Sequence, residues 1–269
     1  MDTSAYPPDW GLPACWQRMR ELVQDAFCSP DHDHFSLGRH FLELRDSRSA
    51  LRLAAFVTGA RLSGAGLSDD IIRGGAAIDM AARALALQER LTDTLACPPG
   101  ENRAILVLGA DWNLAASAAL CGALPAATRD IMAGECLALF ERRFRGAAAI
   151  RVGRAAGQRL TADEYLAVAR DTTGAVFAAL TSIAALLGGA PATVREALAR
   201  TGENIGIAVR ILDDPDPAAV PGGDPAAAAR RHLDLAAAPV LPALDREFRH
   251  DLARLLSVLG RPATVEVGT

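Results

Sequence analysis

Apolar residues recur along most of the chain at the three- and four-residue spacing of a helix. The alternation of apolar and polar residues that is typical of half-buried strands is rare. Runs rich in Ala, Leu, Arg and Glu favour helix, and Pro and Gly breaks separate them. The pattern predicts one all-α bundle of about ten helices, several of them apolar on most sides and therefore central.

The predicted helices begin at capping residues and end at breaks. They cover residues 13–27, a short stretch ending at 44, 47–62, 68–92, 101–120, 125–145, 161–187 and 193–212, with two weaker helices in 225–259. A loop rich in Pro, Gly and Asp covers 215–224, and tails are expected at 1–12 and 260–269. Because neither a repeat nor a linker is evident, we expect a single domain spanning 1–269.

Composition narrows the functional classes. Hydrophobic residues make up 51% of the 269 residues, which supports a sizeable core, but aromatics make up only 5%, so Ala and Leu must do most of the packing. The formal net charge of −4 gives no electrostatic case for nucleic-acid binding. The chain contains no Lys, which excludes Schiff-base catalysis and a P-loop lysine.

The cysteines and the termini indicate a compartment. An odd number of cysteines, five, without close pairs argues against a disulfide framework or a zinc site. No basic region followed by an apolar run marks the N-terminus. No apolar run of about 18 residues escapes interruption by charge or Gly. We therefore expect a cytoplasmic protein without a signal peptide or a transmembrane helix.

The segment 202–217 carries the clearest chemical signal. An apolar helical run ends there in three carboxylates within four residues, Asp213, Asp214 and Asp216. Acids at the end of a buried helix repel one another and lose hydration, and hard oxygen ligands suit Mg²⁺. The segment therefore indicates a metal-held anion site. The alternative is that these acids end a helix and solvate a loop.

Four segments in order resemble the trans-isoprenyl diphosphate synthase family, the polyprenyl synthetase-like all-α fold. Residues 76–93 lie where the family has its first aspartate-rich motif, and residues 109–114 resemble its Gly-Asp-Tyr-Leu-Leu helix start. Residues 157–177 resemble its Gly-Gln and Lys-Thr-Gly segments, and residues 202–214 resemble its second acidic signature. The resemblance covers roughly residues 35–217. The chain after Pro217 departs from the family and is shorter.

The resemblance implies an isoprenoid-synthase bundle and its chemistry. Members of the family ionise an allylic diphosphate in an apolar cavity. Metal ions, here expected to be Mg²⁺, bridge the diphosphate to two carboxylate motifs on facing helices and act as Lewis acids. The family is commonly dimeric, with long helices meeting across a two-fold axis.

The two acidic motifs are degenerate here. Glu89 and Asp93 occupy the first and last acidic positions of the first motif and share a helix face, so they are candidate metal ligands. Arg90 replaces the middle acid and could reach the diphosphate. Asp213 and Asp214 match the first two acids of the second motif, and Pro217 replaces the third. For the first motif, an ordinary exposed helix with intrahelical ion pairs is the alternative.

The basic pocket for isopentenyl diphosphate is eroded. Only Arg48 remains of Gly-Lys-Arg, Thr172 replaces the lysine of Lys-Thr-Gly, and Arg210 replaces a glutamine. Because a diphosphate needs several cations, this loss predicts no normal isopentenyl diphosphate site. Arg48, Arg90, Arg210 and Thr172 are the expected substrate contacts. Trp112 and Phe177 could line the cavity and stabilise a carbocation, or could pack in the core.

Two functions follow from this pattern. The first is an atypical Mg²⁺-dependent enzyme that binds and ionises an isoprenyl diphosphate, by terpene synthase-like chemistry or unusual prenyl transfer. The second is a catalytically inactive partner subunit that modulates an active prenyl diphosphate synthase. Either would be a homodimer or a heterodimer with a related synthase.

Overall fold

Helices form every regular element in the part of the chain that the structure describes, which confirms the predicted all-α fold class. The computed structural model describes residues 11–27, 48–92, 103–157, 159–214, 220 and 222–238. The elements are α1 (Leu12–Phe27), α3 (Ser49–Leu62), α4 (Asp69–Thr92), α5 (Arg103–Gly122), α6 (Ala126–Ala155), α7 (Ala162–Ala169), the π-helix η2 (Arg170–Gly174), α8 (Ala175–Leu187), α9 (Ala192–Leu212) and α10 (Pro225–Ala237).

Most predicted helices lie where expected, and two predictions were wrong in detail. Helix α6 ends at Ala155 rather than near residue 145, because Gly146 continues the helix instead of ending it. The predicted helix 161–187 is divided by η2 into α7 and α8. Thr161 does cap α7, in a capping box with Glu164. The predicted helix ending at 44, the tail 260–269 and the second C-terminal helix lie outside the described residues.

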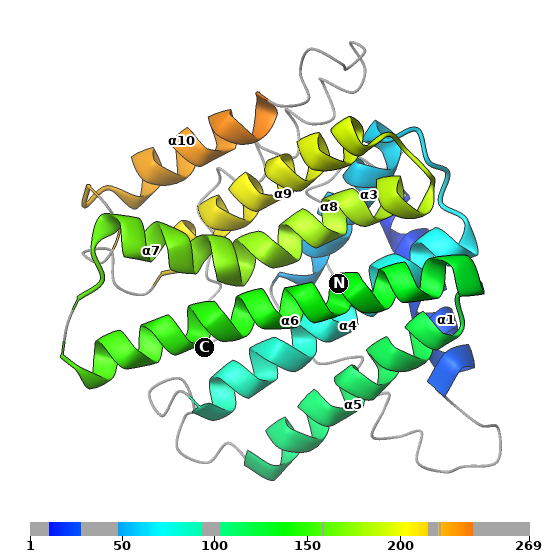
Figure 1. The fold of residues 1–269 in the computed structure, drawn as a ribbon, viewed down its shortest axis with the longest axis horizontal. Helices are drawn as coiled ribbons and strands as arrows, with labels where there is room; N and C mark the ends of the chain where they lie inside the picture. The colour runs from blue at the N-terminus through cyan, green and yellow to red at the C-terminus, as the bar shows by residue number, and fades with distance from the viewer. Residues whose placement is uncertain are drawn as a thin grey trace, which may run out of the picture.

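The long helices lie side by side with roughly parallel axes, and α1 and α3 lie behind one end of the bundle (Figure 1). Helix α8 is central and packs against α3, α4 and α9. Its sequence contains no charged residue, so it can be buried on most of its circumference. This burial explains why the segment is apolar without a clear polar stripe.

Small residues let the neighbouring helices approach α8 closely. A Cβ atom at Gly202 of α9 would lie 2.3 Å from the carbonyl oxygen of Phe177 in α8, which is not sterically possible. The Thr181 hydroxyl lies 2.8 Å from the carbonyl oxygen of Leu198, so α8 and α9 are also joined by a hydrogen bond. The close packing therefore depends on glycine at position 202.

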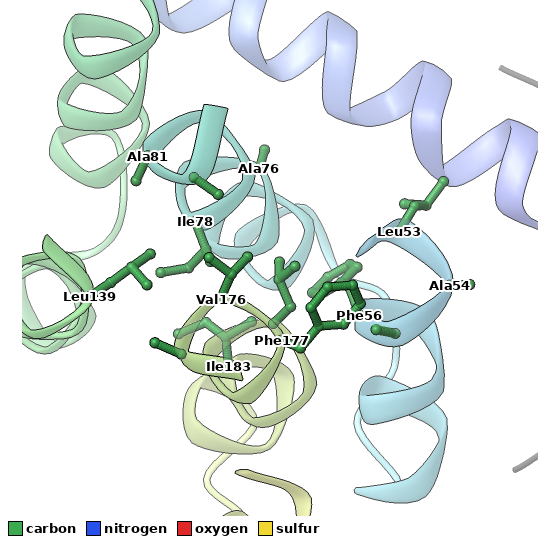
Figure 2. Close-up of a cluster of buried hydrophobic side chains, with 14 of the residues drawn as sticks. Leu53, Ala54, Phe56, Ala76, Ile78, Ala81, Leu139, Val176, Phe177 and Ile183 are labelled. Carbon is green, nitrogen blue, oxygen red and sulfur yellow. The ribbon is translucent and has the colours of Figure 1, made fainter. Parts of the chain in front are cut away.

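Aliphatic side chains and a few aromatic rings fill the core. Figure 2 shows Phe177 of α8 next to Phe56 of α3, and Val176 near Ile78 of α4. All four side chains are buried within one hydrophobic cluster. The scarcity of aromatic residues thus leaves Ala, Leu, Ile and Val as the main packing material, as the composition predicts.

Helix α5 differs from the sequence expectation about the membrane. Among the described helices, it alone is long and apolar enough to cross a membrane by length and composition, with a mean hydropathy of 1.6. Within its most apolar window, 44% is buried in the fold. A single helix of this kind is weak evidence for a membrane span, because core helices of soluble proteins share these properties.

Candidate functional site

The end of α4 places the first acidic motif on the wall of a cavity. Glu89 lies in the last turns of α4, and its side chain is 37% exposed. Its Oε1 atom accepts hydrogen bonds from Arg143 of α6, at 2.6 Å from Nη2 and 3.1 Å from Nε. Arg143 is buried and Glu89 is partly exposed, so this short, charge-assisted contact lies where the fold meets solvent.

The cavity between α4 and α6 has a volume of about 510 Å³. One part of its lining is polar and carries two guanidinium groups and one carboxylate, and the other part is apolar. The lining consists of Leu85, Gln88, Glu89, Leu91, Arg143, Phe144, Ala147, Ala148 and Arg151. A molecule with an anionic head and a hydrocarbon chain matches this division.

The second acidic motif lies at the end of α9, and arginine neutralises its acids too. Asp213 follows the last residue of α9, and its Oδ2 atom lies 2.7 Å from Nε of Arg48. Asp214 lies 3.3 Å from Arg210 and accepts a hydrogen bond from the Tyr165 hydroxyl at 3.1 Å. Burial and the charge of Asp214 raise the pKa of Tyr165, so this hydroxyl stays protonated and donates.

The described acids do not fit a shared Mg²⁺ ion. Glu89, Asp213 and Asp214 each contact an arginine instead of one another. In the described ranges, no group of three His, Cys, Asp or Glu side chains could hold a metal ion. Asp93 lies outside these ranges, so its pairing with Glu89 around Mg²⁺ stays a prediction.

The remaining predicted substrate contacts are dispersed. Phe177 is 1% exposed and packs in the core, and Trp112 of α5 packs against the same core. Thr172 is buried in η2 and donates a hydrogen bond to the carbonyl oxygen of Val168 at 2.8 Å. None of these three side chains lines the α4–α6 cavity. Arg90 is exposed near the end of α4.

Two cavity residues were missed from the sequence. Arg143 lies in the run Glu141-Arg142-Arg143-Phe144-Arg145, for which the sequence pattern predicted only a helix. Arg151 was hidden by the wrong end predicted for α6. Since α6 continues past Gly146, Arg151 remains on a helix and reaches the cavity. The signal that could have found it is the helix-compatible sequence from 147 to 152.

A second, buried charge cluster lies farther back along α4. Asp79 contacts Arg52 of α3 at 2.5 Å and Arg83 of α4 at 2.8 Å, and the Ser49 hydroxyl accepts from Arg83 at 3.1 Å. Arg83 also lies over the ring of Trp16 of α1, 5.2 Å from its centroid. Burial opposes ionisation of Asp79, but the two guanidinium groups outweigh it and lower the pKa. The cluster thus joins α1, α3 and α4 through side-chain contacts.

Sequence similarity to curated proteins covers a short part of this chain. No family model matches the chain. The (2E,6E)-farnesyl diphosphate synthase of Mycobacterium tuberculosis is 48% identical over 52 residues, which is 19% of this chain. The match spans 14% of the length of that curated relative.

Solved structures match over nearly the whole chain. A decaprenyl diphosphate synthase from Rhodobacter capsulatus aligns with a TM-score of 0.70 and 21% identity over 94% of this chain and 97% of that one. A geranylgeranyl pyrophosphate synthase from Corynebacterium glutamicum, complexed with calcium and isoprenyl diphosphate, aligns with a TM-score of 0.72 and 17% identity over 93% and 95%. A polyprenyl synthetase from Streptomyces coelicolor A3(2) aligns with a TM-score of 0.71 and 18% identity over 92% and 99%. The resemblance seen in the sequence is thus confirmed at the level of the fold, and the chain has the all-α fold of the trans-isoprenyl diphosphate synthase superfamily.

Proposed function

We propose that this chain is an atypical enzyme of the isoprenoid synthase fold that binds one isoprenyl diphosphate in the α4–α6 cavity and ionises it. The observation that carries the proposal is the composition of the cavity wall. Two arginines lie on the same lining as Leu85, Leu91 and Phe144. This lining suits a diphosphate head and an isoprenyl chain, the substrate with which relatives of this fold are complexed.

The reaction needs only one bond to break at the start. The carbon–oxygen bond of the allylic diphosphate breaks heterolytically, and both electrons leave with the diphosphate oxygen. Arg143 and Arg151 stabilise the charge that develops on the leaving group. The allylic cation lies along the apolar wall, where water or a double bond of its own chain captures it, with loss of a proton in either case.

The other basic residues support a reaction without isopentenyl diphosphate. Arg48 is bound to Asp213, and Arg210 is bound to Asp214. Thr172, which stands where the family has a lysine, donates its hydroxyl hydrogen to the carbonyl oxygen of Val168 in α7. A second diphosphate would therefore find few free cations at the positions that the resemblance indicates.

The direct test is product release by the full chain. The protein is incubated with geranyl, farnesyl or geranylgeranyl diphosphate, with and without Mg²⁺, and pyrophosphate is measured. We expect pyrophosphate release from at least one substrate. When isopentenyl diphosphate is added, we expect no prenyl diphosphate of greater chain length to form. Folded protein that releases pyrophosphate from none of them would overturn the enzymatic proposal.

A noncatalytic partner subunit is the second candidate, and one surface supports it. Helices α5 and α6 expose large apolar side chains: Leu108 is 53% exposed, Leu137 68% and Val152 71%. Large apolar side chains exposed on neighbouring helices are typical of a subunit interface. We propose that a subunit of the same fold covers these side chains: a second copy if the chain is an enzyme, and a related synthase if it is not.

Assembly can be measured independently of catalysis. Light scattering on the purified chain tests for the homodimer, and co-purification with a synthase that carries both complete motifs tests for the heterodimer. A changed product length in the presence of this chain would favour the second candidate. A stable monomer that leaves the synthase unaffected would contradict both assemblies.

A further inference from the structure

Three of the acids that the resemblance assigns to metal binding lie within the described residues, and each contacts an arginine. Glu89 contacts Arg143, Asp213 contacts Arg48 and Asp214 contacts Arg210. We infer that arginine has taken over the role of the metal ions, and that Arg143 and Arg151 hold the diphosphate in the α4–α6 cavity without a divalent cation. This inference rests on the proposed function, because it concerns the same cavity and the same substrate class.

Arg143 is built into the site. It is only 9% exposed, lines the cavity and is held by Glu89 through two of its nitrogens, Nη2 and Nε. The third nitrogen, Nη1, makes no hydrogen bond within the described residues. A buried guanidinium group with a free edge, turned to a cavity, can bind an anion through a charge-assisted hydrogen bond.

Arg151 supplies a second cation on the same helix. It follows Arg143 by eight residues, about 12 Å along the axis of α6, a separation that two long arginine side chains can close. Within the described part of the chain it has no ion-pair partner, and it lines the same cavity. Between the two arginines, Ala147 and Ala148 leave the space open because their side chains end at Cβ.

The charges of the lining decide between an anion and a cation as ligand. Among the described residues of the lining, two guanidinium groups and one carboxylate give a net charge of +1. A divalent cation would be repelled by both arginines and would have to displace Arg143 from Glu89. A diphosphate would be attracted by the same groups, and here Glu89 acts as the counter-ion that keeps Arg143 in place when the cavity holds no anion.

Glu89 separates the two mechanisms because they predict opposite signs. If Glu89 holds a metal ion, E89Q weakens diphosphate binding. If Glu89 competes with the diphosphate for Arg143, E89Q tightens it. The glutamine keeps the size of the side chain and removes its charge, so the variant changes the electrostatics with little effect on packing.

The test is the binding of farnesyl thiolodiphosphate, which resists ionisation, to the full chain by titration calorimetry in EDTA and in Mg²⁺. We expect affinities within about threefold of each other, and tighter binding by E89Q. Loss of one charge-assisted contact, as in R143Q or R151Q, should weaken binding about tenfold or more. R145Q is the matched control, since Arg145 lies on α6 but is bound to Glu141 outside the cavity.

The outcomes separate this inference from the proposed function. Binding that requires Mg²⁺, or that E89Q weakens, overturns the arginine mechanism and leaves the proposed function intact. No binding under either condition overturns both. Binding in EDTA without pyrophosphate release from farnesyl diphosphate supports the arginine site and favours the noncatalytic subunit. If R143Q does not fold, E89Q and the exposed R151Q still decide the question.

Discussion

Two acidic residues of α4 have arginine partners in different surroundings. Asp79 is buried, with two arginines and a serine hydroxyl around it. Glu89, ten residues later, pairs with Arg143 at the edge of a cavity and is partly exposed. The comparison separates a buried ion pair that joins helices from one that borders a cavity, where the proposed anion would compete with Glu89 for Arg143.

The largest effect is expected from removing the buried acid. Asp79→Ala leaves Arg52 and Arg83 buried without their counter-ion, and loss of one partner from a buried cluster costs about 3–5 kcal/mol. Urea denaturation measures the free energy of unfolding. The matched control is Asp70→Ala, which breaks a partly exposed pair with Arg73 on the same helix and should cost about 1 kcal/mol or less. Equal losses for the two variants would contradict the assigned role of Asp79.

Lowering the pH should gradually remove the stabilisation that Asp79 contributes to the fold. Because the folded-state pKa of Asp79 is lowered, its stabilisation is fully present above the unfolded pKa of about 3.9 and is lost as pH falls toward the folded value. The difference in unfolding free energy between wild type and Asp79→Asn should therefore shrink below about pH 4. Denaturation curves from pH 7 downward measure it. A difference independent of pH would show that the charge of Asp79 is not what stabilises the fold.

The pair at the cavity should matter less for stability. Glu89→Gln removes the counter-ion of the buried Arg143 but leaves a partly exposed amide oxygen that can still accept its hydrogen bond, so the free energy of unfolding should fall by about 1–2 kcal/mol. Thermal or urea unfolding checks this value beside that of Asp79→Ala. A loss as large as that of Asp79→Ala would mean that Glu89 is also a structural residue, and the distinction between the two sites would fail.

The smallest effect is expected at Asp213. Its pair with Arg48 is accessible to solvent, with side chains 32% and 39% exposed, so Asp213→Asn should change stability by about 0–1 kcal/mol. If arginines replace the metal, pyrophosphate release should also stay within about twofold of wild type, which is small beside the tenfold steps expected of metal ligands. A large loss of release in Asp213→Asn would restore the second acidic motif as a metal site.

Local sequence signals were enough for most helices but not for the partners of their charged residues. Helix α4 could be predicted because its first-turn acids and apolar periodicity both lie within one segment. The contact between Asp79 and Arg52 joins residues 27 positions apart and depends on how α3 crosses α4. Even so, an acid within an apolar run, four residues before Arg83, was a usable local signal.

The candidate site was predicted in part for the same reason. Glu89 was found by its position in the motif, but Arg143 lies 54 residues away on another helix. Arg151 could be found only if the end of α6 was predicted correctly. Helix ends are hard to predict when a glycine such as Gly146 allows close packing within a helix instead of ending it. A Cβ atom there would lie 2.7 Å from Cγ2 of Thr172, so close packing against η2 explains this glycine.

Internal neutralisation of the acidic motifs has a practical consequence for screening. A ligand raises the melting temperature only if it binds the folded state better than the unfolded one. With arginines already seated on Glu89, Asp213 and Asp214, melting curves recorded with a chelator and with Mg²⁺ should coincide. If the proposal holds, pyrophosphate and prenylated anions are the additives that should move the curve, so a ligand screen restricted to metal salts would miss the proposed ligands.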